Sequence, residues 1–124
     1  MKKSILIVDD EPVIVMFVTA RLRANGYEVI TASGGFEALD LVRRYKPNLI
    51  LLDIMMPNMN GYEFLAALKK IPRTKSVPII MFTAKVQKED IDRAMALGAQ
   101  DCVIKPFTPE ELLSKIQNAL VTMA

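Results

Sequence analysis

The chain has 124 residues, 52% of them hydrophobic and 24% charged, a balance that predicts one domain over residues 1–124 with a core that needs no disulfide or metal. Sixteen basic and fourteen acidic residues are scattered along the sequence and give a net charge of +2, so a nucleic-acid partner is not favoured. One cysteine and no histidine exclude an internal disulfide and a Cys/His zinc site, and no uncharged run exceeds nine residues, too few for a membrane-spanning helix of about 20.

The first half of the chain alternates short apolar strands with amphipathic helices. Residues 4–8 are apolar throughout, which is typical of a strand covered on both faces of a parallel sheet. Residues 27–32 alternate more between polar and apolar and predict an edge strand. A helix that ends at Asn25 and Gly26 lies between these strands, and a second helix covers residues 34–46. The side chains expected to face the core from the two helices are Val13, Ile14, Phe17, Val18, Leu22, Phe36, Leu39 and Val42.

The second half of the chain continues the alternation. Residues 49–52 are the most hydrophobic strand and are therefore the expected centre of the sheet. Asn60, with Glu63 three positions later, fits a capping box at the start of a helix. Thr108 fits the N-cap of the last helix, with Pro109 at the first helical position. The remaining predicted elements are strands at 77–82 and 102–104 and a helix over 88–97.

Strict alternation of strands and helices with short connections predicts an α/β fold, a doubly wound, five-stranded parallel sheet with helices on both faces. In such sheets, ligands bind outside the carboxyl ends of the strands, where the direction of winding reverses. The residues that directly follow the predicted strands are therefore the candidates for chemistry.

Polar side chains follow four of the five predicted strands. Asp9 and Asp10 come after the first strand, Asp53 after the third, Thr83 after the fourth and Lys105 after the fifth. Because the carboxyl ends of parallel strands share one edge of the sheet, these side chains are expected to meet. Clustered carboxylates repel one another, so either their pKa values rise or they hold a cation, and hard oxygen ligands at a hydrated edge favour Mg²⁺.

This set of residues suits phosphoryl transfer, in which positioning and neutralisation of charge supply most of the catalysis. Lys105 would contribute a point charge and Thr83 a hydroxyl donor to the phosphoryl oxygens. Asp53 is the predicted nucleophile, because it stands alone at its strand end while Asp9 and Asp10 sit together as a metal-binding pair. Taken singly, Asp10 also fits a helix N-cap, Thr83 a turn residue and Lys105 a surface cation.

Four sequence motifs together resemble the receiver domain of two-component response regulators. They are ILIVDDE at 5–11, LILLDIMMPNMNG at 49–61, FTA at 82–84 and VIKPF at 103–107. The motifs occur in the right order and at the predicted strand ends, and the resemblance covers the whole chain. It implies a flavodoxin-like (βα)5 fold with the strand order 2-1-3-4-5, which is the order of the chemotaxis member of that family.

The resemblance also implies which residues bind the metal and which one is phosphorylated. Asp53 matches the phosphoacceptor. Asp10 and Asp53 would bind Mg²⁺ directly, together with the backbone carbonyl of Met55, and Asp9 would act mainly through a metal-bound water.

Three further positions match the family around the phosphoryl group. Thr83 matches the hydroxyl that moves towards the phosphoryl group, and Lys105 matches the lysine that contacts it. Pro106 would follow a cis peptide bond. The phosphoryl donor would be a phosphohistidine on a sensor histidine kinase or a phosphotransfer protein, and it must be on another chain because this one has no histidine.

Cys102 departs from the usual pattern of the family. It occupies the position, three before Lys105, where many receivers have a tyrosine or phenylalanine that rotates inward with the threonine. Switching is therefore expected either to use residues 84–88 and the fourth helix alone or to be small. Cys102 itself fits a small buried strand residue with a raised pKa and low reactivity.

Two positions that vary among receivers, and that tune how long the acyl phosphate survives, are Met55 and Lys85. They lie two residues after Asp53 and Thr83. Because an apolar Met55 cannot orient a water molecule by hydrogen bonding, slow self-dephosphorylation is predicted.

Three other functions fit part of the pattern. An FMN-binding protein would share the fold, but the acids of DDEP at 9–12 would repel a phosphate where such proteins need a loop rich in hydroxyl groups and glycine. Aspartyl-phosphate hydrolases typically have a second acid two residues after the nucleophile, where this chain has Met55. An adaptor that binds partners without phosphorylation is disfavoured by the set Asp53, Thr83 and Lys105.

The predicted function is that of a signalling phosphoacceptor that assists its own phosphorylation and dephosphorylation, and not that of an enzyme. Phosphorylation would shift a two-state equilibrium, and the fourth helix, fifth strand and fifth helix would present the changed face to a downstream effector. A monomer or a weak phosphorylation-dependent dimer is expected, in the cytoplasm, where a single cysteine stays reduced. No output domain is expected, because the sequence ends just after the last helix, although a receiver excised from a larger multidomain regulator is an alternative to a stand-alone protein.

Overall fold

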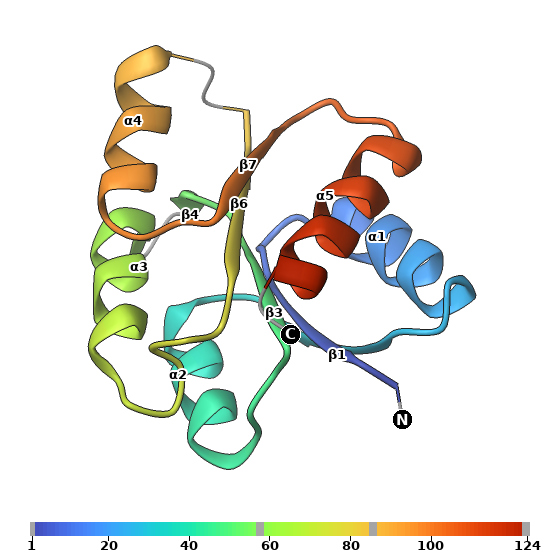
Figure 1. Ribbon diagram of the computed structural model, residues 1–124, viewed down its shortest axis with the longest axis horizontal. Helices are drawn as coiled ribbons and strands as arrows, with labels where there is room; N and C mark the ends of the chain where they lie inside the picture. The colour runs from blue at the N-terminus through green and yellow to red at the C-terminus, as the bar shows by residue number, and fades with distance from the viewer. Residues whose placement is uncertain (1, 57–58, 85–86, 123–124) are drawn as a thin grey trace.

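Five parallel strands form the central sheet of the protein (Figure 1). The computed structural model describes residues 2–56, 59–84 and 87–122. The elements in chain order are β1 (Ser4–Val8), α1 (Pro12–Ala24), β2 (Glu28–Ala32), α2 (Gly35–Arg44), β3 (Leu49–Leu52), β4 (Met55–Met56), β5 (Met59–Asn60), α3 (Gly61–Lys70), β6 (Ile79–Thr83), α4 (Lys88–Ala96), β7 (Asp101–Ile104) and α5 (Pro109–Thr122).

The strand order of the central sheet is β2-β1-β3-β6-β7. When the five strands are counted along the chain, this is the order 2-1-3-4-5, as the resemblance implied. All four pairings are parallel. β3 is central with every residue buried, and β2 is an edge strand, as their sequences predict. The doubly wound α/β fold is confirmed.

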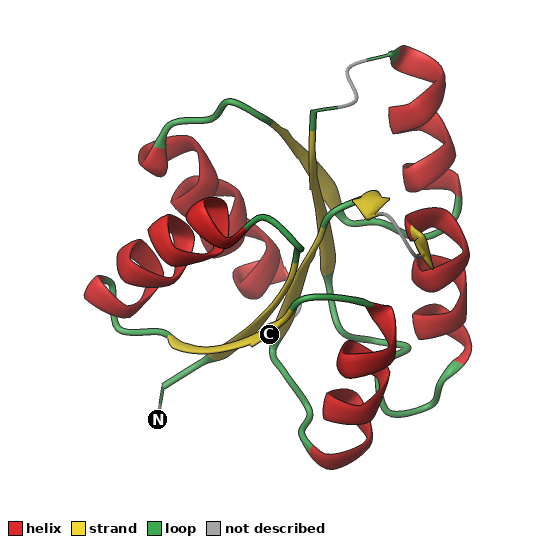
Figure 2. Cartoon of the chain, turned by 180° about the vertical axis from the view of Figure 1, so that it is seen from behind, coloured by secondary structure: helices red, strands yellow, loops and turns green. Residues whose placement is uncertain are grey.

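Helices cover both faces of the sheet. α1 and α5 lie on one face, and α2, α3 and α4 lie on the other, as Figures 1 and 2 show from opposite sides. Alternate strand residues serve two separate cores. In β1, Ile5 and Ile7 pack with α1 and α5, whereas Leu6 and Val8 pack with α2, α3 and α4. Burial on both sides explains why β1 is an uninterrupted apolar run.

Side-chain caps begin two of the helices where the sequence predicts them. The side chain of Asn60 accepts hydrogen bonds from the backbone N–H groups of Tyr62 and Glu63, so Asn60 is the N-cap of α3. The hydroxyl of Thr108 accepts a hydrogen bond from the N–H of Glu111 at the start of α5. Both caps satisfy backbone donors that the helix itself leaves unpaired.

Two apolar side chains of α1 that were predicted to face the core are exposed. Val13 and Phe17 lie on the outer face, and the buried residues of the helix are Val18 and Leu22. Residues 12–18 are apolar on almost every side of the helix, so their spacing could not identify the side that contacts the sheet.

The predicted inward face of α2 is also wrong at one position. Phe36 is 81% exposed, whereas Val42 is buried as predicted, and the other buried residues of α2 are Gly35 and Ala38. Small residues allow the helix to approach the sheet closely, and a search for large apolar side chains overlooks them.

The segment after β3 contains a short antiparallel hairpin, β4 with β5, that the sequence did not predict. It leads into α3 at Gly61, where the backbone passes very close to the residue after Asp53. A Cβ atom added to Gly61 would lie 2.5 Å from the Cα atom of Ile54, so this position requires glycine.

Among the residues that the structure describes, no helix is long and apolar enough to span a membrane.

Candidate functional site

The carboxyl edge of the sheet brings together the polar residues predicted from the sequence. Asp53 follows β3, and its backbone N–H donates to the carbonyl of Val8 at 3.0 Å, next to Asp9 at the end of β1. Lys105 follows β7, and its N–H donates to the carbonyl of Thr83 at 2.8 Å. Backbone pairing of neighbouring strands therefore brings these side chains to one edge.

Asp9, Asp10 and Asp53 form an acidic cluster. One carboxylate oxygen from each residue lies within 4.8 Å of the others. Asp9 and Asp53 are only 1% and 2% exposed, and Asp10 is half-buried. Carboxylate oxygens at this spacing, at an edge that water can reach, are ligands suited to a hard divalent cation.

Lys105 reaches into the acidic cluster with a single positive charge. Its Nζ donates to Asp9 Oδ2 at 2.9 Å, Glu11 Oε1 at 3.0 Å and Asp53 Oδ2 at 3.3 Å. The ammonium also lies 4.8 Å from the ring centroid of the buried Phe82, a favourable contact between a cation and an aromatic ring. These four contacts hold the lysine over the carboxylates.

Glu11 was not among the predicted site residues. It is the third acid of the DDE motif, but nothing in the sequence distinguishes it from a solvated helix-start residue. Only the fold shows that its side chain turns towards Lys105, 94 residues further along the chain.

The pKa values of Asp9 and Lys105 depart from their ordinary values. Burial raises the pKa of the Asp9 carboxyl, although the hydrogen bond from the N–H of Glu11 and the nearby Lys105 oppose that shift. Burial lowers the pKa of Lys105, but the hydrogen bonds to Asp9 and Glu11 and the charge of Asp53 outweigh it, so the pKa lies above its usual value. The ammonium is therefore charged at neutral pH, and one cation faces three clustered carboxylates.

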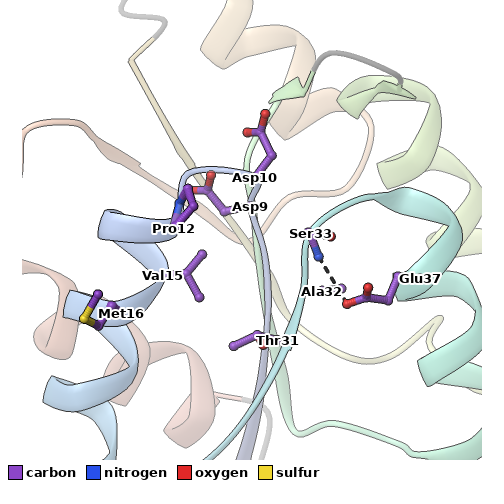
Figure 3. Close-up of a pocket in the computed structure, with 9 residues that line it drawn as sticks. All are labelled: Asp9, Asp10, Pro12, Val15, Met16, Thr31, Ala32, Ser33 and Glu37. Carbon is purple, nitrogen blue, oxygen red and sulfur yellow. Dashed lines mark hydrogen bonds between the residues drawn. The ribbon is translucent and has the colours of Figure 1, made fainter.

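A cavity of about 320 Å³ opens beside the acidic cluster, between α1 and the start of α2 (Figure 3). Asp9 and Asp10 line one end of it, and Met16 lies on the α1 side. On the opposite side, Glu37 accepts a hydrogen bond from the backbone N–H of Ser33 at 3.3 Å. Solvent therefore reaches the carboxyl edge of the sheet next to Asp10.

Thr83 and Met55 flank Asp53. Thr83 is buried as the last residue of β6, the strand paired with β3. The backbone N–H of Met55 donates to Asp53 Oδ1 at 3.0 Å and orients that carboxylate, while the Met55 side chain is exposed. The structure thus brings both predicted residues to the site, with an apolar side chain on the solvent side.

The remaining predicted positions lie on or near β7, except for Lys85, which lies outside the described residues. The peptide bond before Pro106 is cis, as the resemblance implied. Cys102 is half-buried, and burial, with a smaller contribution from Asp101, raises the pKa of its thiol. Cys102 is therefore a strand residue as predicted, but it is only half-buried where full burial was expected, and the raised pKa of its thiol agrees with the prediction of low reactivity.

A buried carboxylate paired with a lysine, two neighbouring acids and a buried threonine at the carboxyl edge of a doubly wound sheet define a class of protein. It is the class of phosphoacceptor signalling domains, in which positioned charges assist phosphoryl transfer to a carboxylate. The pattern contains no glycine-rich phosphate loop of the kind that nucleotide-binding relatives of this fold use.

The sequence model of the response regulator receiver domain family matches residues 5–117, so the chain belongs to this family. It is 45% identical over 119 residues to a probable transcriptional regulator, ycf27, of Porphyra purpurea, and the match covers 96% of this chain and 48% of that protein. The chain therefore spans about half the length of the curated relatives it matches. The prediction of a phosphoacceptor receiver domain from a two-component system is confirmed.

Solved structures of receivers have the same fold. The chemotaxis protein CheY4 of Vibrio cholerae is 36% identical with a TM-score of 0.91, and the match covers 96% of this chain and 99% of that one. The receiver domain of the sensor histidine kinase PA1611 from Pseudomonas aeruginosa is 30% identical with a TM-score of 0.89, over 98% of this chain and 99% of that one. That second structure has a magnesium ion coordinated in its active-site cleft.

Proposed function

We propose that Asp53 is the phosphoacceptor of this receiver and that Lys105 and Thr83 bind the transferred phosphoryl group. The observation that carries this proposal is the distance of 3.3 Å between Lys105 Nζ and Asp53 Oδ2, in a pair whose side chains are 10% and 3% exposed. A carboxylate held beside a fixed ammonium has the counter-charge that an added phosphoryl group requires.

The acidic cluster is the proposed magnesium site. Asp10 and Asp53 would hold Mg²⁺ together with the backbone carbonyl of Met55, and Asp9 would act mainly through a metal-bound water. The spacing of the three carboxylates, within 4.8 Å, fits one hard cation, and the magnesium-bound relative supports the choice of metal. When bound, Mg²⁺ supplies positive charge that offsets the carboxylates and the phosphoryl oxygens.

The proposed reaction moves one phosphoryl group between two side chains. A carboxylate oxygen of Asp53 attacks the phosphorus of a phosphohistidine on another chain. A P–O bond forms, the P–N bond breaks, and the departing imidazole nitrogen takes a proton from solvent. Lys105 stays protonated throughout and donates hydrogen bonds to the phosphoryl oxygens, which is consistent with its raised pKa.

The signal would leave the site through Thr83. Thr83 ends β6 and α4 begins at Lys88, so a shift of the threonine towards Asp53 would be passed along the chain to the start of that helix. We infer that α4, β7 and α5 form the face that a downstream effector protein reads. Cys102, in place of an aromatic residue, makes the connection through α4 the main route, and Lys85 with Met55 tunes how long the phosphoryl group remains.

The proposed partners are a sensor histidine kinase or phosphotransfer protein and an effector protein. The domain would act in the cytoplasm as a signalling switch and not as an enzyme, as a monomer or a weak phosphorylation-dependent dimer. Because the matched regulators are about twice as long, it would serve either by itself or as the receiver of a larger regulator.

Chemical trapping of the acyl phosphate tests the assignment of Asp53. The protein is incubated with Mg²⁺ and a small phosphodonor, reduced with borohydride, and digested for peptide mass spectrometry. Reduction converts a phosphorylated aspartate to homoserine, and we expect that residue only at position 53. Homoserine at Asp9 or Asp10 would overturn the assignment, and no trapped residue at all would favour an adaptor that works without phosphorylation.

A further inference from the structure

Among the described residues, Glu11 is the one carboxylate that contacts Lys105 without belonging to the acidic cluster. Its Oε1 lies 3.0 Å from Lys105 Nζ, as near as Asp9 at 2.9 Å and nearer than Asp53 at 3.3 Å. We propose that Glu11 competes with the phosphoryl group for Lys105 and thereby slows phosphorylation by doubly charged donors. The proposal rests on the proposed function, because it assigns to Lys105 a phosphoryl ligand.

The side chain of Glu11 does not cap α1. Glu11 occupies the N-cap position with an extended backbone, but its carboxylate makes no capping hydrogen bond. Its backbone N–H instead donates to Asp9 Oδ1 at 2.9 Å. Within the part of the chain that the structure describes, the Glu11 carboxylate pairs with Lys105, so its effect falls on the lysine and not on the helix.

Lys105 has no spare donor for an incoming phosphoryl oxygen. A lysine ammonium carries three N–H groups, and three carboxylates lie within 3.3 Å of it. Any phosphoryl oxygen that binds the ammonium must take the place of one of them. The free-energy cost of displacing that carboxylate from Lys105 is therefore part of the barrier to phosphoryl binding.

Glu11 is the partner that can leave. Its side chain is 55% exposed, whereas the side chains of Asp9 and Asp53 are almost fully buried. An exposed carboxylate regains water when it swings away from Lys105, but a buried carboxylate would lose its counter-charge without such compensation. Glu11 also approaches Lys105 from the solvent side, so its charge repels an anion that arrives there.

The competition predicts a dependence on the charge of the donor. A doubly charged acyl phosphate is repelled by Glu11 more strongly than a singly charged phosphoramidate. The substitution Glu11→Gln keeps the size of the side chain and removes its charge. Removing an exposed ion pair of this strength should change the rate of phosphorylation by about two- to fivefold.

The matched control is Glu37→Gln. Glu37 lines the cavity beside the acidic cluster and accepts a hydrogen bond from the N–H of Ser33 (Figure 3). Among the described residues, the carboxylates paired with Lys105 are those of Asp9, Glu11 and Asp53, and Glu37 is not one of them. The two variants lose the same charge close to the same edge of the sheet. Only Glu11→Gln removes a partner of Lys105.

Initial rates of phosphorylation with Mg²⁺ are measured for wild type and both variants with each donor. The expected result is that Glu11→Gln is about two- to fivefold faster than wild type with acyl phosphate and gains less with phosphoramidate, while Glu37→Gln matches wild type. Equal rates for Glu11→Gln and wild type, or equal gains in both variants, would overturn the competition. A slower Glu11→Gln would mean that Glu11 positions Lys105 for the reaction.

A binding measurement separates this inference from the proposed function. Inorganic phosphate is titrated into the unphosphorylated protein, and the backbone amide of Lys105 is followed by NMR. Tighter phosphate binding by Glu11→Gln, by about two- to fivefold, supports the competition even if wild type accepts no phosphoryl group. Unchanged binding together with normal phosphorylation of wild type would leave the proposed function standing and refute the role of Glu11.

Discussion

Lys105 and Asp53 lie 52 residues apart in the sequence and meet at 3.3 Å in the folded protein, between the ends of β7 and β3. The contact joins a cation to a carboxylate that is 2% exposed. Burying a carboxylate is costly unless it is paired, so this lysine stabilises the fold, and in the proposed function it would also bind the phosphoryl group.

Replacing Lys105 by methionine is expected to destabilise the metal-free protein. The variant leaves Asp9 and Asp53 buried without their cation, and the free energy of unfolding should fall by about 1–3 kcal/mol. The pKa of Lys105 is raised in the folded protein. The stability difference between wild type and variant is therefore fully present below pH 10.5, the usual pKa of lysine, and is lost as the pH rises through the pKa of Lys105 in the folded protein. Urea unfolding with a chelator, at neutral pH and above pH 11, measures both effects.

Lys115→Met is the control for that substitution. Lys115 also pairs with an aspartate, Asp101, at 3.2 Å, but both side chains are partly exposed. Its loss should cost less than about 1 kcal/mol. Equal destabilisation by the two variants would show that Lys105 is not the counter-charge of the buried site.

Gly61→Ala is expected to disturb the backbone next to Asp53. The new methyl group would approach the Cα of Ile54 to 2.5 Å, and backbone atoms cannot move aside cheaply. We expect a loss of about 1–3 kcal/mol in the free energy of unfolding, measured by thermal or urea denaturation. At Gly34 an added Cβ meets nothing within 4 Å, so Gly34→Ala should unfold at nearly the wild-type denaturant concentration. If Gly61→Ala has the same free energy of unfolding as wild type, the backbone after β3 can move away from the new methyl group, and the prediction is wrong.

Tyr62→Phe is expected to loosen α4. The hydroxyl of Tyr62 donates to Asp90 Oδ1 at 3.0 Å, and the Arg93 guanidinium lies 4.1 Å from the ring centroid, so this residue of α3 holds the first turns of α4. Loss of this hydrogen bond should lower the free energy of local opening of α4 by about 1 kcal/mol, which corresponds to roughly fivefold faster amide exchange in α4. Hydrogen exchange followed by mass spectrometry gives the rate for each peptide.

The matched variant is Tyr27→Phe, which removes a tyrosine hydroxyl just before β2, on the opposite side of the sheet from α4. It should leave exchange in α4 unchanged. If both variants accelerate amide exchange in α4 equally, the effect reflects the global stability of the protein and not the contact between α3 and α4.

Met55→Asn is expected to shorten the life of the acyl phosphate. The exposed methionine cannot hold a water molecule by hydrogen bonding, whereas an amide at that position can. One hydrogen bond to the attacking water corresponds to roughly a tenfold faster loss of phosphate. The decay of the phosphorylated mass after removal of the donor measures the rate. Met16→Asn, at an exposed methionine of α1, should decay like wild type, and an unchanged rate in Met55→Asn would refute the prediction.

Much of the fold could be predicted because it depends on local patterns. The uninterrupted apolar run of β3, and the acid that directly follows it, place Asp53 at a strand end without any knowledge of distant contacts. Lys105 could be predicted in the same way. The strand order came from the resemblance of four motifs, since periodicity alone does not order strands.

The positions that could not be predicted depend on three-dimensional packing. Phe36 is exposed because the smaller Gly35 and Ala38 face the sheet, which the spacing of large side chains does not show. The turn of Glu11 towards Lys105 depends on where two distant strands end. Both errors concern the direction of a side chain, whereas the short β4–β5 hairpin is an element that the sequence did not predict.

The most direct test of the central claim is the intact mass of the protein after incubation with Mg²⁺ and a small phosphodonor, beside an Asp53→Asn variant and a sample with chelator. The account predicts a single phosphoryl adduct on wild type that requires Mg²⁺ and is absent from the variant. An adduct of equal size on Asp53→Asn, or no adduct on wild type with any divalent metal, would contradict the assignment of Asp53 as the phosphoacceptor.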